Sequence, residues 1–215
     1  MIFLTKKKDV YAEAAAAFVR QHWPEAVVLR GERGQEPPHG GYRFENPDWI
    51  ISYLYPHILE DWFLEIAKKG AINFHPSKYR GAGGPNWAIY NGDKMYRALA
   101  HYMTPKLDDG DIINLWDMPI HPTDTPYSIY QRARHHLIII FYETIEDILR
   151  GHSPQKVAIW PDKKLYTLAM LDELGRITPD MPEQEVERRI KATTYPGWTG
   201  AYVDLNGYRF RLEVS

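Results

Sequence analysis

The sequence predicts an α/β protein: a Rossmann-like, mostly parallel sheet flanked by helices, followed by a small C-terminal subdomain that ends in a β-hairpin. Apolar strand-like segments alternate with helical segments through most of the chain. The polar residues Asn73 and His75 close one of these strands, and Asn206-Gly207 separates two alternating segments near the C-terminus. We expect the main domain to cover residues 1–155 and the subdomain to cover residues 156–215.

The N-terminal segments follow the order strand, turn, helix. Residues 2–4 are apolar enough for a short strand, and Asp9 can cap a helix over residues 10–23. Residues 26–29 favour a second strand. Residues 31–46 are rich in Gly, Pro and charge, which is typical of a loop.

The next segments continue the alternation. Residues 49–54 favour a strand, and residues 59–69 place apolar side chains at helical spacing, with Gly70 as the expected C-cap. A strand over residues 71–75 then ends at Pro76. Because ligands of parallel α/β sheets gather at the carboxyl ends of the strands, Asn73 and His75 are predicted to lie at a ligand site.

The second half of the chain predicts a strand at residues 98–103, a turn at 106–111 and a long helix over 127–150, whose apolar residues recur along one face. A short helix is expected over residues 183–192. In the hairpin, Asn206-Gly207 supplies the positive φ angles of a type I′ turn. One face of that hairpin is apolar: Val203, Leu205, Tyr208, Phe210 and Leu212.

Composition excludes several classes of protein. The 215 residues have a net charge of -2, which gives no general attraction to polyphosphate and makes nucleic acid an unexpected partner. The chain has no cysteine, so it has neither a disulfide framework nor a thiolate zinc site. His135-His136 has no partner at metal-ligand spacing and there is no HExxH pattern, so we predict no metal.

We expect neither a targeting segment nor a membrane span in this sequence. Its first apolar stretch precedes Lys6, Lys7 and Lys8, which reverses the order of a secretory signal. The longest apolar run, residues 137–142, is far short of the roughly 20 residues that cross a bilayer. We therefore expect no membrane partner and a cytoplasmic location.

The chemistry is predicted from Asn73, His75 and an acidic turn. Residues two apart on a strand project to the same side, so this amide and imidazole share one space. Acyl transfer to an amine needs a hydrogen-bond donor for the developing oxyanion and a group that takes the amine proton. A carboxylate that orients the imidazole completes such a site, and the turn at residues 107–111 offers Asp108, Asp109 and Asp111.

These residues lie in ordered motifs, between about residues 49 and 113, that resemble the folate-dependent formyltransferase family. The motifs are Asn73-Phe74-His75-Pro76-Ser77, Tyr79-Arg80-Gly81, Trp87-Ala88-Ile89, His101-Tyr102-Met103 and Leu107-Asp108-Asp109-Gly110-Asp111-Ile112. The stretch Gly83-Gly84-Pro85-Asn86-Trp87-Ala88, and the C-terminal segment over residues 188–197, are more similar to the nucleotide-sugar N-formyltransferases. The family commonly has Gly where this chain has Arg97.

The resemblance implies the roles of individual residues. Asn73, His75 and Asp108 would be catalytic, and the cosubstrate would be 10-formyltetrahydrofolate. Its pterin would lie between residues 55–59 and the Asp108 turn. The residues implied to bind it are Tyr55, His57, Ile58, Leu59, Leu107, Asp109 and Asp111. The residues implied to bind the acceptor are Pro76, Ser77, Gly83, Asn86 and His101, although His101 can equally be a filling residue of its strand.

The acceptor implied by the resemblance is a nucleotide-linked amino sugar such as dTDP-4-amino-4,6-dideoxyglucose, formylated for lipopolysaccharide biosynthesis. Alternatives stay open: a methionyl-tRNA or glycinamide-ribonucleotide type of formyltransferase, or a catalytically silent folate-binding module in which Arg97 blocks the cleft. Lys6 to Lys8 could meet a diphosphate at the N-terminus of the first helix or form a solvated turn. The apolar hairpin face fits either a homodimer or a docked tail.

Overall fold

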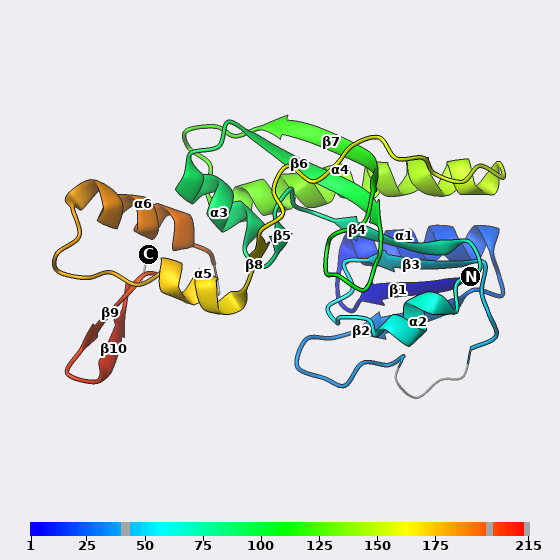
Figure 1. Cartoon of the computed structure of the whole chain (residues 1–215), viewed down its shortest axis with the longest axis horizontal. Coiled ribbons are helices and arrows are strands. Elements are labelled where there is room, and N and C mark those ends of the chain that lie inside the picture. The colour runs from blue at the N-terminus through cyan, green and yellow to red at the C-terminus, as the bar shows by residue number, and fades with distance from the viewer. Residues whose placement is uncertain (40–43, 197–199, 213–215) are drawn as a thin grey trace. The chain divides into compact units, whose positions relative to one another are not determined.

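The computed structural model describes residues 1–39, 44–196 and 200–212 (Figure 1). Residues 40–43 of the predicted loop, and Gly197 of the C-terminal segment, lie outside the described residues. The chain forms two compact units. Unit 1 comprises Met1–Pro76, Ala98–Trp116 and Arg134–Pro161, and unit 2 comprises Ser77–Arg97, Asp117–Ala133 and Asp162–Ser215.

A six-stranded sheet has the order β2-β1-β3-β4-β6-β7. Its strands are β1 (Ile2–Lys6), β2 (Val27–Gly31), β3 (Trp49–Tyr53), β4 (Gly70–His75), β6 (Met95–Tyr102) and β7 (Ile112–Pro119). Strands β2, β1, β3 and β4 pair in parallel, whereas β6 is antiparallel to β4. The mostly parallel sheet is confirmed. The edge strand β7 was not predicted, because its apolar residues do not alternate regularly with polar ones.

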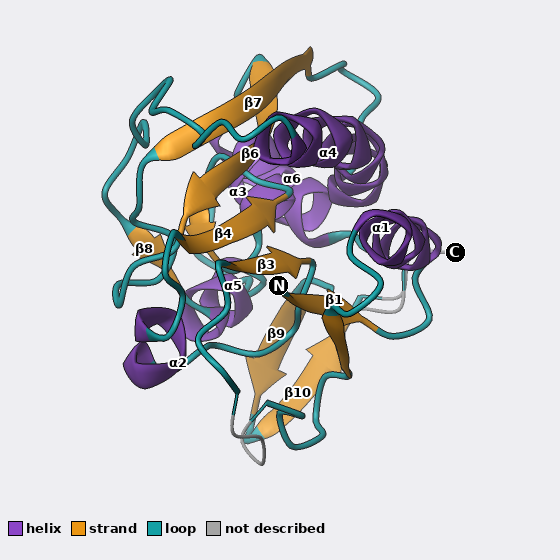
Figure 2. Cartoon of the chain, turned by 90° about the vertical axis from the view of Figure 1, so that its right-hand side faces the viewer, coloured by secondary structure: helices purple, strands orange, loops and turns teal. Residues whose placement is uncertain are grey.

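Helices α1 (Val10–His22) and α4 (Pro126–Leu149) lie on one face of the sheet (Figure 2). Asp9 caps α1 as predicted, since its carboxylate accepts from the backbone N–H groups of Tyr11 and Ala12. Phe141 of α4 centres the core between the layers, with ring centroids 5.1 Å from Phe74 and 5.3 Å from Tyr53. No helix within residues 1–39, 44–196 and 200–212 is long and apolar enough to cross a membrane.

The other face of the sheet is covered by the short helix α2 (Asp61–Glu65), whose Phe63 is fully buried. The longer helix predicted over residues 59–69 is wrong. The backbone N–H groups of Lys68 and Lys69 donate to the carbonyls of Pro47 and Asp48, which draws these residues out of helical geometry. Gly70 is not a C-cap; it opens β4 with a φ of 129°, a conformation that favours glycine.

Unit 2 is built on two packed helices, α3 (Gly84–Asn91) and α6 (Glu183–Thr193). The Asn86 side chain donates to the carbonyl of Ala192 (2.8 Å), and the Tyr90 hydroxyl donates to Glu185 (2.9 Å). The short strands β5 (Arg80–Gly81) and β8 (Leu165–Tyr166) pair in parallel, and α5 (Leu168–Leu174) follows.

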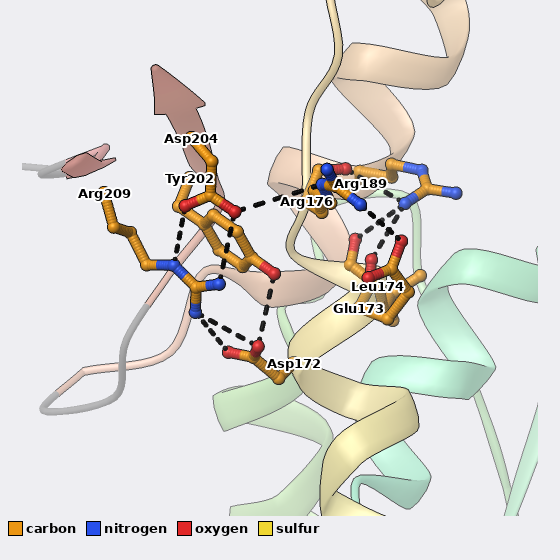
Figure 3. Close-up of polar contacts among 8 residues, drawn as sticks. All are labelled: Asp172, Glu173, Leu174, Arg176, Arg189, Tyr202, Asp204 and Arg209. Carbon is orange, nitrogen blue, oxygen red and sulfur yellow. Dashed lines mark hydrogen bonds and ion pairs between the residues drawn. The ribbon is translucent and has the colours of Figure 1, made fainter. Parts of the chain in front are cut away.

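The predicted hairpin is confirmed as β9 (Tyr202–Leu205) and β10 (Tyr208–Arg211), with Asn206 and Gly207 at φ values of 51° and 82°. Its polar face is anchored to α5 (Figure 3). Arg209 lies between the carboxylates of Asp204 (2.9 Å) and Asp172 (3.1 Å), and the Tyr202 hydroxyl donates to Asp172 (3.2 Å). These contacts fix the orientation of the hairpin within unit 2.

Candidate active site

A row of polar side chains crosses three adjacent strands of unit 1. Ser52 of β3 is in register with Asn73 of β4, which is in register with His101 of β6. The Ser52 hydroxyl donates to Asn73 Oδ1 (2.9 Å), and Asn73 Nδ2 lies 3.3 Å from His101 Nε2. The Asn73 carboxamide is therefore held at both ends.

His75 and Asp108 complete the cluster. His75 Nδ1 lies 3.9 Å from Asp108 Oδ1, and His101 Nε2 lies 3.5 Å from the same oxygen. Asp108 is 7% exposed. The amide, imidazole and carboxylate predicted to act together thus converge, and His101 lies among them.

The Asp108 turn has an unusual backbone. Asp108 itself has a φ of 48°, in the left-handed region, which Asp tolerates better than most residues. At Gly110, an added Cβ would lie 1.8 Å from the carbonyl oxygen of Tyr102. The Tyr102 N–H donates to the Asp111 carbonyl (3.0 Å) and closes the turn onto β6. Glycine at 110 therefore permits the close approach that places the Asp108 carboxylate.

Trp160 packs against the two histidines of this cluster, a contact that the sequence did not predict. Its indole Nε1 donates to the Gly110 carbonyl (2.9 Å), and its ring lies 5.2 Å from His101 and 5.9 Å from His75, edge-on to both. It thus supports the turn and shields the imidazoles from water. Trp160 ends a short apolar run over residues 157–160, and nothing in that run indicates a contact with a residue 50 positions away.

A buried histidine, His39, contacts Tyr55 at the start of segment 55–59. His39 is fully buried; its Nδ1 lies 2.9 Å from the Tyr55 hydroxyl and its Nε2 lies 3.0 Å from Glu60. Burial, and then the nearby Glu60 charge, raises the pKa of Tyr55, so its phenol stays neutral at physiological pH. Burial, and then His39, lowers the pKa of His57.

Apolar side chains of this segment and of the Asp108 turn are exposed to solvent. Ile58 is 72% exposed and Leu107, at the Asp108 turn, is 38% exposed, while Leu59 packs on the core. Both segments therefore present apolar side chains to solvent. Asp111 is paired with Lys156 (2.6 Å). Among the described residues, no three His, Asp or Glu side chains are grouped to hold a metal ion.

A comparison with known protein families identifies the family of this chain. A model described as formyl transferase matches residues 6–145, a range that includes Asn73, His75, His101 and Asp108. The chain belongs to the formyl transferase family.

Three curated relatives of this chain differ in name. The bifunctional polymyxin resistance protein ArnA of Wigglesworthia glossinidia brevipalpis is 31% identical over 73% of this chain and 24% of ArnA. A methionyl-tRNA formyltransferase of Agathobacter rectalis is 31% identical over 78% of this chain and 54% of that protein. A GDP-perosamine N-formyltransferase of Brucella melitensis biotype 1 is 30% identical over 75% of this chain and 62% of that protein. The chain thus spans less than two thirds of the length of each.

Solved structures show the same fold. A sugar N-formyltransferase from Shewanella sp FDAARGOS_354 superposes with a TM-score of 0.78 at 15% identity, over 100% of this chain and 96% of that one. An N-formyltransferase from Helicobacter canadensis, solved with folinic acid and dTDP-3-aminofucose, gives a TM-score of 0.71 at 15% identity, over 96% and 84%.

Each residue predicted to bind the acceptor belongs to one of the two units. Pro76 follows β4 directly, and His101 lies in the cluster, both in unit 1. In unit 2, the Ser77 hydroxyl donates to the Tyr79 carbonyl (3.0 Å), Gly83 is the left-handed N-cap of α3, and Asn86 binds the carbonyl of Ala192. These three residues have local structural contacts in unit 2.

Arg97, and the lysines Lys6 and Lys8 before the first helix, lie beside carboxylates. Arg97 forms a bidentate ion pair with Asp117 (2.7 and 2.8 Å), so its charge is neutralised between β6 and β7. Lys8 pairs with Glu32 (3.2 Å), and Lys6 lies 3.7 Å from Asp9. The carboxylate of Asp9 already occupies the N-terminus of α1.

Gly31→Ala should weaken the binding of folinic acid. A Cβ at Gly31 would lie 2.7 Å from ring atoms of both Tyr55 and His57, so these two rings of segment 55–59 must shift. We expect the Kd for folinic acid, measured by calorimetry, to rise about 10-fold, as a strain of 1–3 kcal/mol implies. Turnover at saturating formyl donor should change little, because the Asn73 cluster is untouched. An unchanged Kd would mean that segment 55–59 does not contact the folate.

Proposed function

We propose that this formyl transferase moves a formyl group from 10-formyltetrahydrofolate to the amine of a nucleotide-linked amino sugar, such as dTDP-4-amino-4,6-dideoxyglucose. The observation that carries the proposal is the convergence of Asn73, His75 and Asp108 at the carboxyl end of β4. The proposal extends to a cytoplasmic reaction that serves lipopolysaccharide biosynthesis.

Each side chain of the cluster has one task in this reaction. The acceptor nitrogen forms a bond to the formyl carbon, and the bond from that carbon to the folate nitrogen breaks. Asn73 Nδ2 donates to the formyl oxygen as negative charge develops on it. His75 takes the proton that the amine loses and returns it to the departing folate nitrogen. Asp108 orients His75 and stabilises its cationic form.

We propose that the formyl donor binds a partly apolar surface of unit 1. Ile58 and Leu107 present exposed apolar side chains, and Tyr55, His57 and Leu59 hold segment 55–59 against the core. Support for a folate also comes from the Helicobacter structure, which is described as a complex with folinic acid. Asp109 and Asp111 follow Asp108 in the turn and complete the proposed cosubstrate site.

The acceptor class rests on several observations. One relative is named for a nucleotide sugar, GDP-perosamine, and the Helicobacter structure holds dTDP-3-aminofucose. A relative of similar identity is named for methionyl-tRNA, but a net charge of -2 disfavours a polyphosphate partner. Pro76, Ser77, Gly83, Asn86 and His101 are the residues proposed to contact the sugar nucleotide. The pairing of Arg97 with Asp117 speaks against a cleft blocked by Arg97.

A ligand panel tests the proposal. Unfolding temperatures are measured with folinic acid, dTDP-4-amino-4,6-dideoxyglucose, dTDP-3-aminofucose, GDP-perosamine, glycinamide ribonucleotide and methionyl-tRNA, and turnover is then assayed with 10-formyltetrahydrofolate. A ligand at about 100 times its Kd should stabilise the fold by roughly 2.7 kcal/mol. We expect folinic acid and one amino sugar to stabilise it and that sugar to be formylated. Stabilisation by folinic acid with no formylation of any amine would support a silent folate-binding module instead.

We also propose a homodimer formed through the C-terminal hairpin. Its apolar face is between 36% and 72% exposed: Val203, Leu205, Tyr208, Phe210 and Leu212. The register pairs Val203 with Phe210 and Leu205 with Tyr208, which gathers these side chains into one strip. Since Arg209 pins the opposite face to α5, the strip is presented to solvent, and a second copy offers the same strip across a two-fold axis.

Phe210→Ser should weaken that dimer. Loss of a central aromatic contact should raise the dimer dissociation constant by about 10- to 100-fold, which sedimentation velocity at several concentrations measures. Val10→Ser, which removes an exposed apolar side chain from α1, is the matched control and should leave the constant unchanged. A monomeric parent protein at every concentration would exclude the hairpin dimer.

A further inference from the structure

His101 has a protonation state that its contacts define. The ring is 1% exposed, and its Nδ1 lies 2.7 Å from the carbonyl oxygen of Tyr102. A carbonyl oxygen only accepts hydrogen bonds, so Nδ1 must carry a hydrogen. In a neutral ring with a hydrogen on Nδ1, Nε2 is left with a lone pair and acts as an acceptor.

The neighbouring amide needs that acceptor. The Ser52 hydroxyl donates to Asn73 Oδ1, which turns Asn73 Nδ2 toward His101 Nε2, 3.3 Å away. An amide nitrogen only donates, so a cationic His101, with hydrogens on both ring nitrogens, could not receive this bond. With the Asn73 carboxamide in this orientation, the row from Ser52 through Asn73 to the Tyr102 carbonyl is fully hydrogen-bonded when His101 is neutral.

Asp108 lies near both imidazoles, so the charge of His101 affects which ring the Asp108 carboxylate pairs with. Its Oδ1 lies 3.5 Å from His101 Nε2 and 3.9 Å from His75 Nδ1, and Trp160 closes the space beside both rings. A cationic His101 would attract the Asp108 carboxylate and compete with His75 for it. A neutral His101 leaves that carboxylate to His75.

We propose that His101 is a positioning residue, held neutral with its hydrogen on Nδ1, that acts with Ser52 to orient the Asn73 carboxamide toward the formyl oxygen. One Asn73 Nδ2 hydrogen is engaged by His101, and the other is presented to the substrate. This role rests on the proposed function, because it assigns the oxyanion donor to Asn73. It gives His101 a role that acts through Asn73, in addition to the acceptor contact proposed above.

The tautomer is tested first, independently of turnover. The full chain is labelled with ¹⁵N-histidine, and its ring nitrogens are assigned by comparing the spectrum with that of His101→Gln. We expect His101 to show a protonated Nδ1 and an unprotonated Nε2 at neutral pH. A hydrogen on Nε2, in either the other tautomer or the cation, would overturn the proposal.

A matched pair of variants then tests the positioning role. His101→Gln keeps a polar amide at the place of Nε2, so its oxygen can accept from Asn73, whereas His101→Asn is too short to reach. With 10-formyltetrahydrofolate and whichever amino sugar of the panel turns over, His101→Asn should lower kcat about 10-fold with little change in KM, since loss of one orienting hydrogen bond has about this effect. His101→Gln should recover most of that loss, and Ser52→Ala should resemble His101→Asn.

A double variant separates this proposal from the proposed function. If Asn73→Ala lowers kcat and His101→Asn adds no further loss to it, the two residues act through one contact. If Asn73→Ala lowers kcat but His101→Asn and His101→Gln are equally active, the positioning role fails and the proposed function stands. If Asn73→Ala leaves kcat unchanged, the proposed role of Asn73 fails, and the positioning role fails with it.

Discussion

Asn73→Ala is expected to lower the turnover number by about 10²- to 10³-fold, the usual effect of removing one oxyanion donor. The carboxamide is held by Ser52 and His101, so its donor is aimed before the substrate arrives and no reorganisation is needed. Alanine removes the donor without introducing bulk into the strand. Steady-state kinetics should show the loss in kcat, with a smaller change in KM, because the interaction strengthens as charge develops on the formyl oxygen.

Two further variants make the Asn73 result specific. Asn73→Asp keeps the shape of the side chain but replaces the donor with an acceptor, and should be at least as inactive as alanine. Asn114→Ala removes an amide on β7 that contacts Glu143 outside the cluster, and should turn over like the parent. Unfolding curves must show that Asn73→Ala remains folded. Near-normal turnover of a folded Asn73→Ala protein would remove Asn73 from the reaction.

Gly110→Ala is expected to lower both stability and turnover. The new Cβ would lie 1.8 Å from the backbone oxygen of Tyr102, and a backbone atom in a strand cannot move aside as a side chain can. The turn must shift, which should destabilise the fold by about 1–3 kcal/mol in urea unfolding, as overpacking of a tight site does. The shift also displaces the Asp108 carboxylate and breaks the bond from Trp160 to the Gly110 carbonyl.

The turnover of Gly110→Ala should therefore fall even where the protein is fully folded. Gly200→Ala is the matched control, because its Cβ would meet its nearest neighbour, the Leu212 carbonyl, at an ordinary 3.4 Å. We expect this control to lie within about 0.5 kcal/mol of the parent, as unstrained surface substitutions do. Equal stability of the two variants would show that the Asp108 turn relaxes freely.

The sequence by itself determined the elements that depend on neighbouring residues. Asp9 caps α1, and Asn206-Gly207 forms the hairpin turn. The long helix α4 follows from apolar residues that recur at helical spacing. Asn73 and His75 could be placed on one side of a strand end because side chains alternate along any strand. The ordered motifs indicated the family, which the match over residues 6–145 confirms.

Only the tertiary structure decided features that join distant parts of the chain. Strand β6 is antiparallel to β4, and helix α2 is shortened by bonds to Pro47 and Asp48. Trp160 reaches Gly110 across 50 residues, and Ser52, Asn73 and His101 meet only because three strands align in register. Local propensity acts over a few residues, whereas these contacts depend on how the whole sheet assembles, so no short pattern in the chain could encode them.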